Sequence, residues 1–170
     1  VGIPFSAPPR TRPLLAYLAI KRARPVQRDS VAFALWPDTD EQAARANLRR
    51  HLHYLSRALP PATTPWTVGD KRVVQWNPAR ADVFDVAEFE RLLANAGART
   101  QAVDLYVGDL LEDLDEEWIA YERERLRSMQ LSALELLIAE SAAAADATRT
   151  VFFARRLLQV DRWREDALRA

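Results

Sequence analysis

The sequence contains no cysteine, only one methionine and only four glycines, which are scattered singly. Without cysteine the chain has neither disulfides nor thiolate metal sites, and this composition fits the reducing cytoplasm. Four isolated glycines form no phosphate-cradling loop, and the G-x-x-x-x-G-K-[ST] pattern is absent. No hydrophobic run approaches the length of a membrane-spanning helix. These absences exclude several classes of enzyme and give no indication of a membrane partner.

Histidine is also scarce, since His51 and His53 are the only two. Two residues apart on a helix, they point in different directions and cannot share a metal ion. The acidic cluster at 112–117 is better explained by helix capping and solvation than by a bound cation. The five tryptophans are spread one per element, as expected of core anchors. We therefore predict that the chain is no enzyme and needs neither a cofactor nor a metal.

The ends of the sequence suggest a fragment of a longer protein. There is no initiator Met, the start lacks the pattern of a signal peptide, and the last residues, 162–170, read as part of a helix. With 170 residues, 49% of them hydrophobic, the chain is expected to fold as one large domain or two small ones.

A formal net charge of zero hides two halves of opposite sign. Residues 1–80 carry 13 Lys and Arg against 5 Asp and Glu, a balance of +8. Residues 81–170 carry 11 against 19, a balance of −8. Such an asymmetry points to a polyanion as the partner of the basic half, with nucleic acid as the first candidate.

The basic half shows the element order of a winged helix-turn-helix. Apolar spacing predicts helices over 14–21, 28–35 and 39–59, the last opened by a capping box at Thr39–Gln42. Two short strands, 66–68 and 73–76, flank the turn residues Gly69 and Asp70. A further strand is expected at 3–7. We therefore predict a winged-helix DNA-binding domain over residues 1–80.

The acidic half is predicted to be entirely helical. Helices are expected at about 86–96, 101–106, 116–144 and 148–160. Long helices with short connections suggest a tetratricopeptide-like helical-repeat module over residues 81–170. The expected fold class is therefore mainly α with a small β-hairpin.

The third predicted helix carries the candidate binding residues. Leu48, Leu52, Leu55 and Leu59 form one stripe, expected to be buried, and cationic and polar side chains lie opposite or beside it. Arg pairs with guanine or phosphate, Asn with adenine, and Tyr or His with phosphate. The candidates for DNA contact are Asn47, Arg49, Arg50, His53, Tyr54 and Arg57, with Lys71 and Arg72 near the hairpin tip. A solvated helix face and a solvated turn are the alternatives.

Several motifs resemble a known family. The run 12–19 with 24–26, 35–38 and 44–50 resembles the DNA-binding domain of the Streptomyces antibiotic regulatory protein family. The runs 73–78, 85–90, 105–111, 117–118 and 122–126 resemble its bacterial transcriptional activator domain. The resemblance covers nearly the whole chain.

This resemblance implies an OmpR-type winged helix over 1–80 in which the strand at 3–7 is all that remains of the initial sheet. It implies a tetratricopeptide-like module over 81–170 that lacks its last helices. It implies an activator that binds double-stranded DNA at direct repeats near promoters and recruits RNA polymerase. The acidic module would contact a second protomer, other domains of the same longer chain or the transcription machinery. The alternative is a protein-interaction module in which the winged helix binds protein instead of DNA.

Overall fold

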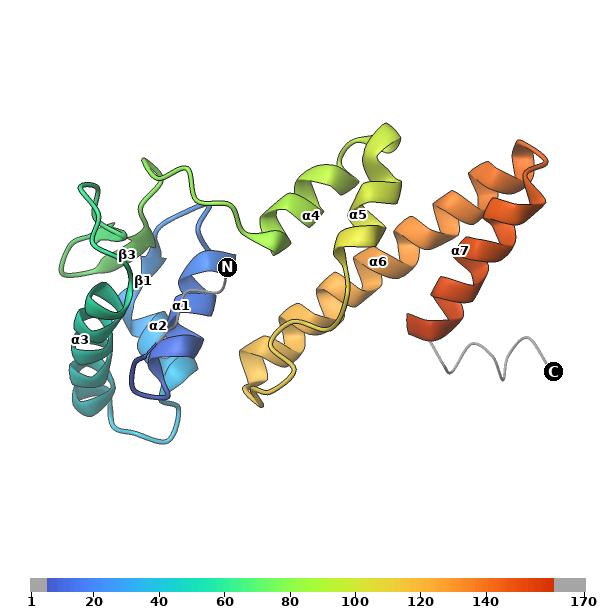
Figure 1. The fold of residues 1–170 in the computed structure, drawn as a ribbon. Helices are drawn as coiled ribbons and strands as arrows, with labels where there is room; N and C mark the ends of the chain where they lie inside the picture. Colours follow the sequence, from blue (N-terminus) through green and yellow to red (C-terminus); the bar gives the residue numbers. More distant parts are fainter. Residues whose placement is uncertain (1–5, 161–170) are drawn as a thin grey trace. The chain divides into compact units, whose positions relative to one another are not determined.

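A computed structural model describes residues 6–160 (Figure 1). The chain divides into two compact units, an N-terminal unit up to Phe84 and a C-terminal unit that begins at Asp85. Most of the predicted strand at 3–7 and the predicted helix beyond Val160 lie outside the described residues, while Ser6 and Ala7 are not in a strand. The fold is mainly helical with one small antiparallel sheet, as predicted.

Three helices form most of the N-terminal unit: α1 (Thr11–Ile20), α2 (Arg28–Leu35) and α3 (Glu41–Ala58). The bounds of α2 are those predicted from the sequence. Helix α1 begins three residues earlier than predicted because Pro13 sits inside its first turn, where a missing N–H is tolerated.

The capping box predicted at Thr39 is wrong. Asp40 is the N-cap of α3, and its carboxylate accepts a hydrogen bond from the Ala43 N–H at 2.9 Å. Thr39 instead donates its hydroxyl to the Trp36 carbonyl at 3.0 Å, which closes the turn between α2 and α3.

The sheet has three short strands, β1 (Val26–Gln27), β2 (Thr67–Gly69) and β3 (Val73–Trp76), in the order β1-β3-β2. All pairings are antiparallel, and Val74 faces both Val26 of β1 and Gly69 of β2. The hairpin of β2 and β3 confirms the prediction from the sequence. Strand β1 was not predicted, because its two residues are too few to show a strand period.

The core of the N-terminal unit combines apolar residues from all three helices and from β3. Its fully buried side chains include Leu14, Leu18, Val31, Leu35, Leu48, Leu55 and Val74. Two members of the predicted leucine stripe behave differently, since Leu52 and Leu59 are only half-buried. The stripe is therefore narrower than expected and is centred on Leu48 and Leu55.

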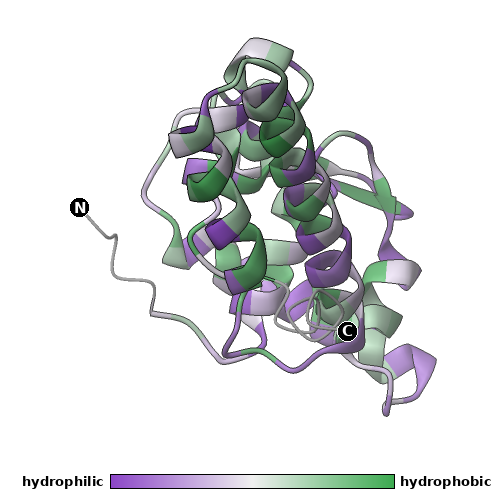
Figure 2. Cartoon of the chain, turned by 90° about the vertical axis from the view of Figure 1, so that its right-hand side faces the viewer, coloured by the Kyte–Doolittle hydropathy of each residue, from purple (hydrophilic) through white to green (hydrophobic). Residues whose placement is uncertain are grey.

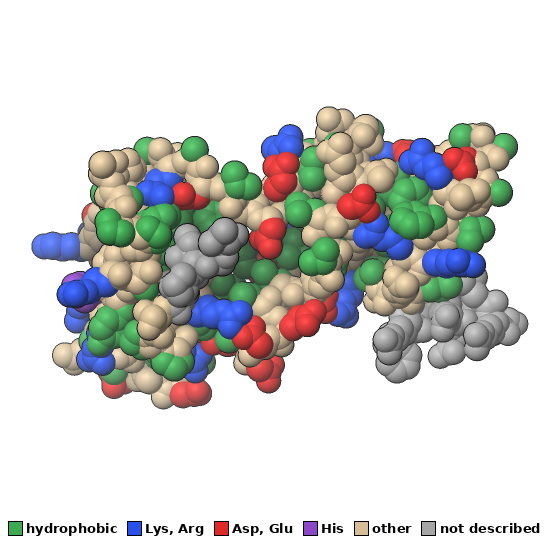
Figure 3. Space-filling view, in the orientation of Figure 1, with side chains coloured by type: hydrophobic (Ala, Val, Ile, Leu, Met, Phe, Trp, Pro, Cys, Tyr) green, Lys and Arg blue, Asp and Glu red, His purple; other side chains and the backbone are tan. Residues whose placement is uncertain are grey.

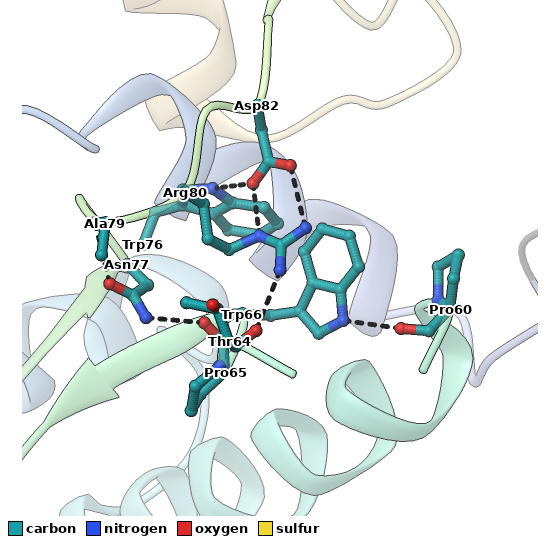
Figure 4. A network of polar contacts seen from close by, with 9 residues as sticks. All are labelled: Pro60, Thr64, Pro65, Trp66, Trp76, Asn77, Ala79, Arg80 and Asp82. Atoms are coloured by element: carbon teal, nitrogen blue, oxygen red, sulfur yellow. Dashed lines mark hydrogen bonds and ion pairs between the residues drawn. The ribbon is translucent and has the colours of Figure 1, made fainter. Parts of the chain in front are cut away.

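A polar network closes the base of the hairpin (Figure 4). The Arg80 guanidinium lies 3.4 Å from the centroid of the Trp66 ring and donates to both carboxylate oxygens of Asp82, at 2.6 and 3.0 Å. The Trp76 indole N–H donates to the same carboxylate at 2.9 Å. The Arg80 guanidinium, helped by the indole, holds the pKa of Asp82 below its ordinary value.

The described part of the C-terminal unit contains helices joined by loops and no strand, consistent with a tetratricopeptide-like module. It contains α4 (Asp85–Leu93), a 3-10 turn η1 (Ala96–Ala98), α5 (Arg99–Leu105), α6 (Glu117–Ala143) and α7 (Ala147–Val160). Each helix carries both hydrophobic and hydrophilic residues (Figure 2). The apolar sides meet in two clusters, centred on Phe89 and Leu126 and on Leu134 and Phe153.

Arginines of α6 fasten the rest of the unit to this helix. Arg123 donates to the carbonyls of Leu110, Leu111 and Leu114, and so holds the segment between α5 and α6. Arg125 bridges Glu122 of α6 and Glu90 of α4. Glu116, at the N-cap of α6, accepts from the Trp118 indole and makes no side-chain capping bond.

Two substitutions in α3 test where its buried side lies. Leu48→Ala should reduce the free energy of unfolding of the N-terminal unit by about 2–5 kcal/mol, because the side chain is 1% exposed. Leu52→Ala should reduce the same free energy by less, about 1–2 kcal/mol, because Leu52 is only half-buried. Denaturant unfolding followed by tryptophan fluorescence measures both. A cost at Leu52 equal to that at Leu48 would show that the helix faces are misassigned.

A second pair of substitutions tests the polar network at the base of the hairpin. Because the folded-state pKa of Asp82 is lowered, its ion pair stabilises the unit above about pH 4 and is lost as the pH falls through that lower value. Asp82→Asn should therefore cost about 1–3 kcal/mol at pH 7 and flatten the loss of stability on acidification. Asp38→Asn, at an exposed position, is the matched control and should cost less than Asp82→Asn at pH 7.

Candidate nucleic-acid interface

The outer face of α3 presents four exposed cationic or titratable side chains: Arg49, Arg50, His53 and Arg57. Among residues 6–160, the three guanidinium groups of this face make no ion pair. Most arginines of the described C-terminal unit, by contrast, are paired with carboxylates, as Arg99 is with Glu140. An unpaired cationic helix face is suited to binding a polyanion.

Asn47 and Tyr54 occupy one edge of this face and are half-buried. They are seven residues apart, two helical turns, and therefore lie on the same side of α3. His51 lies between them, and it is not among the candidates predicted from the sequence. Its ring centroid is 5.6 Å from that of Tyr54, in an edge-on arrangement.

His51 anchors this edge of α3 to the rest of the unit. Its Nδ1 lies 2.9 Å from the hydroxyl oxygen of Thr11, a fully buried residue of α1, and its ring lies 5.1 Å from that of Trp36. Burial, followed by the nearby Arg50 and Arg10, lowers the pKa of His51. These surroundings favour the neutral form of the ring.

The opposite edge of α3 is fastened to α2 by an ion pair. Arg45 donates to both carboxylate oxygens of Asp29, at 2.7 and 2.8 Å, and also pairs with Glu41 at 2.6 Å. The bond from Arg45 holds the pKa of Asp29 below its ordinary value. Arg45 is thus committed to helix packing, whereas the outer arginines remain available.

Asp70 shapes the tip of the hairpin. Its carboxylate accepts from the N–H groups of Arg72 and Val73, at 2.7 and 2.9 Å, and these two bonds lower its pKa. Gly69 has a φ of +151°, and a Cβ there would lie 2.3 Å from the Val73 carbonyl oxygen. Lys71, which lies between Asp70 and Arg72 in the sequence, is exposed. Glycine is required at 69, but it is the last residue of β2 and not part of the turn. The predicted turn lies at 70–72.

The hairpin tip is tied to the start of α2. The Arg28 N–H donates to the Arg72 carbonyl at 2.8 Å, and the Arg28 guanidinium donates to the Asp70 carbonyl at 3.1 Å. These bonds leave the side chain of Arg72 exposed. The hairpin is thereby fixed relative to the helices.

Within the N-terminal unit, the hairpin turn and α3 lie at the same edge (Figure 1). In the space-filling view, Lys and Arg side chains gather along this edge, at the left of the picture (Figure 3). Of the eight residues selected from the sequence, six lie on α3 and two lie at the hairpin tip.

The described residues contain no group of three or more potential metal ligands and no helix that could cross a membrane. The candidate side chains at the edge formed by α3 and the hairpin are exposed or half-buried. They offer guanidinium, ammonium, amide and phenol groups, which bind phosphate oxygens and base edges.

The chain belongs to the bacterial transcriptional activator domain family, whose sequence model matches residues 84–170. This match supports the resemblance inferred for the acidic half, and it covers the whole C-terminal unit. The family is one of transcriptional regulators and not of enzymes. No curated protein is similar enough in sequence to match the chain.

Proposed function

We propose that this chain is the DNA-binding and activator portion of a bacterial transcriptional regulator. The N-terminal unit acts as an OmpR-type winged helix, with α3 as the recognition helix and the hairpin of β2 and β3 as the wing. It binds double-stranded DNA at direct repeats near promoters, as regulators of the Streptomyces antibiotic regulatory protein type do. Such a regulator acts in the cytoplasm.

The observation that carries this proposal is that Arg49, Arg50 and Arg57, exposed on the outer face of α3, make no ion pair within residues 6–160. The hairpin tip, with the exposed Lys71 and Arg72, lies at the same edge of the unit (Figure 1). Holding these three arginines at one edge with Lys71 and Arg72 costs electrostatic energy in the free protein. A phosphate backbone removes that cost and releases counterions on binding. An ordinary solvated face, like that of α4, pairs its exposed arginine with a carboxylate, as Arg91 does with Glu88.

The recognition helix would read base edges with its polar side chains. Arg50 and Arg57 lie opposite the buried Leu48 and Leu55, and so project farthest from the core. Asn47 is suited to an adenine and the arginines to a guanine. Tyr54 and His53 are better suited to phosphates.

The C-terminal unit would supply the protein contacts of an activator. The acidic half has the opposite charge to the DNA-binding half and repels phosphate. Its partners in this proposal are RNA polymerase, a second protomer or further domains of the same longer chain. The family match supports a role in transcription.

Arg50→Ala and Arg57→Ala test the recognition helix. Each should weaken binding to a duplex selected by this chain by about 1–3 kcal/mol and relax the preference at one position, while leaving the fold intact. Arg155→Ala, an exposed arginine of α7, is the matched control. Electrophoretic mobility shifts measure the affinities. Unchanged binding of both α3 variants would refute the assignment of α3.

A double substitution, Lys71→Ala with Arg72→Ala, tests the wing. It should lower affinity for selected and random DNA alike, because the wing would touch phosphates only. The slope of log affinity against log salt should fall by about 1–2, one unit for each phosphate that the variant no longer binds. If the double variant has the same salt slope as the parent protein, the hairpin does not touch the DNA backbone. The module would then be better explained as a protein-interaction surface.

A further inference from the structure

One titratable group of the N-terminal unit, His51, lies between the core and the candidate interface. It belongs to α3 but lies beneath its outer face, half-buried against α1 and the Trp36 ring. Its polar contact is the hydroxyl of Thr11, which is 0% exposed. A histidine placed between the core and a cationic surface responds to both environments.

The charged groups acting on the ring come from two elements. Arg50 precedes it on α3, and Arg10 precedes α1. Of its other neighbours, Tyr54 on α3 presents a phenol edge, and Thr11 and Trp36 carry no charge. Both arginines oppose a positive charge on the ring, and so does its burial.

We propose that DNA binding at α3 is coupled to the uptake of one proton by His51. The inference rests on the proposed DNA-binding function. Asn47, one turn before His51, and Tyr54, one turn after it, are candidate DNA contacts on the same edge of the helix. A phosphate bound there brings a negative charge close to the ring and also neutralises Arg50. Both changes favour the imidazolium.

The contact with Thr11 allows this change without breaking the packing. In the neutral ring one nitrogen accepts and the other carries a proton, and a hydroxyl can both donate and accept. After uptake of a proton from solvent both ring nitrogens are donors, so the Thr11 oxygen becomes the acceptor. The proton therefore reaches the ring while α1 and α3 remain bonded.

The direction of the pH effect follows from this linkage. In the free protein, burial and the nearby Arg50 and Arg10 keep the pKa of His51 below its ordinary value of 6.5. Bound DNA raises that pKa. At pH values between the pKa of the free protein and that of the complex, binding takes up a proton, so the affinity increases as the pH falls. The gain is at most about tenfold for each unit by which DNA raises the pKa.

Imidazole NMR measures the linkage directly, because the whole sequence has only two histidines. The protein is titrated alone and with a mixed-sequence duplex of about two helical turns at low salt. His53→Gln, at an exposed position, identifies the His51 signal. We expect the His51 midpoint to lie below 6.5 in the free protein and to rise in the complex. An unchanged midpoint in a formed complex would refute the proton uptake.

Affinity measurements across a pH range of about 5.5–7.5, which brackets the titration of histidine, provide the second readout. His51→Asn keeps an amide within reach of Thr11 but does not titrate, so the part of the pH dependence that is due to His51 should disappear. His53→Gln removes a candidate phosphate contact, so its affinity should be lower than that of the parent, but the part of the pH dependence that is due to His51 should remain. Equal pH dependence in His51→Asn and the parent protein would overturn the inference while leaving DNA binding intact. Failure of the parent to bind the duplex at any pH would overturn the proposed function as well.

Discussion

The arrangement of the candidate interface depends on the position of β3. This four-residue strand is the central strand of the sheet, paired with β2 through the hairpin and with β1 on its other side. Because β1 ends at Gln27 and α2 begins at Arg28, the same pairing fixes the hairpin to the start of α2. Helix α2 is in turn bonded to α3 through Asp29 and Arg45. One short strand thus sets the position of the hairpin tip relative to the outer face of α3.

Helix α3 is bonded to α2 along one edge and to α1 along the other, and its outer side is exposed. Arg45 fastens one edge to α2, and His51 fastens the other to α1. The buried Leu48 and Leu55 hold its inner side. The arginines that remain on the outer side have no acidic partner among the described residues. A rigid helix with a prepared cationic face loses little conformational entropy on binding, which favours affinity.

Much of this arrangement could be predicted from the sequence, and the parts that could not have identifiable physical causes. Apolar periodicity predicts α2, and short strand runs around the turn residues Gly69 and Asp70 predict the hairpin, since both signals are local. The two-residue β1 was missed because its stability comes entirely from its pairing with Val73 and Val74. The N-cap was placed one residue early because Thr39 and Asp40 are both good capping residues and only the fold decides between them. His51 was overlooked because its partner, Thr11, is 40 residues away.

The most direct measurement of the central claim is a map of the residues whose NMR signals change when a selected duplex is added at moderate salt. If α3 and the hairpin bind DNA, we expect changes in the side-chain signals of Arg49, Arg50 and Arg57, and in the backbone signals of Lys71 and Arg72, with the largest effects along α3. Changes confined to the acidic unit, over residues 85–160, with the α3 signals unaltered, would contradict the claim.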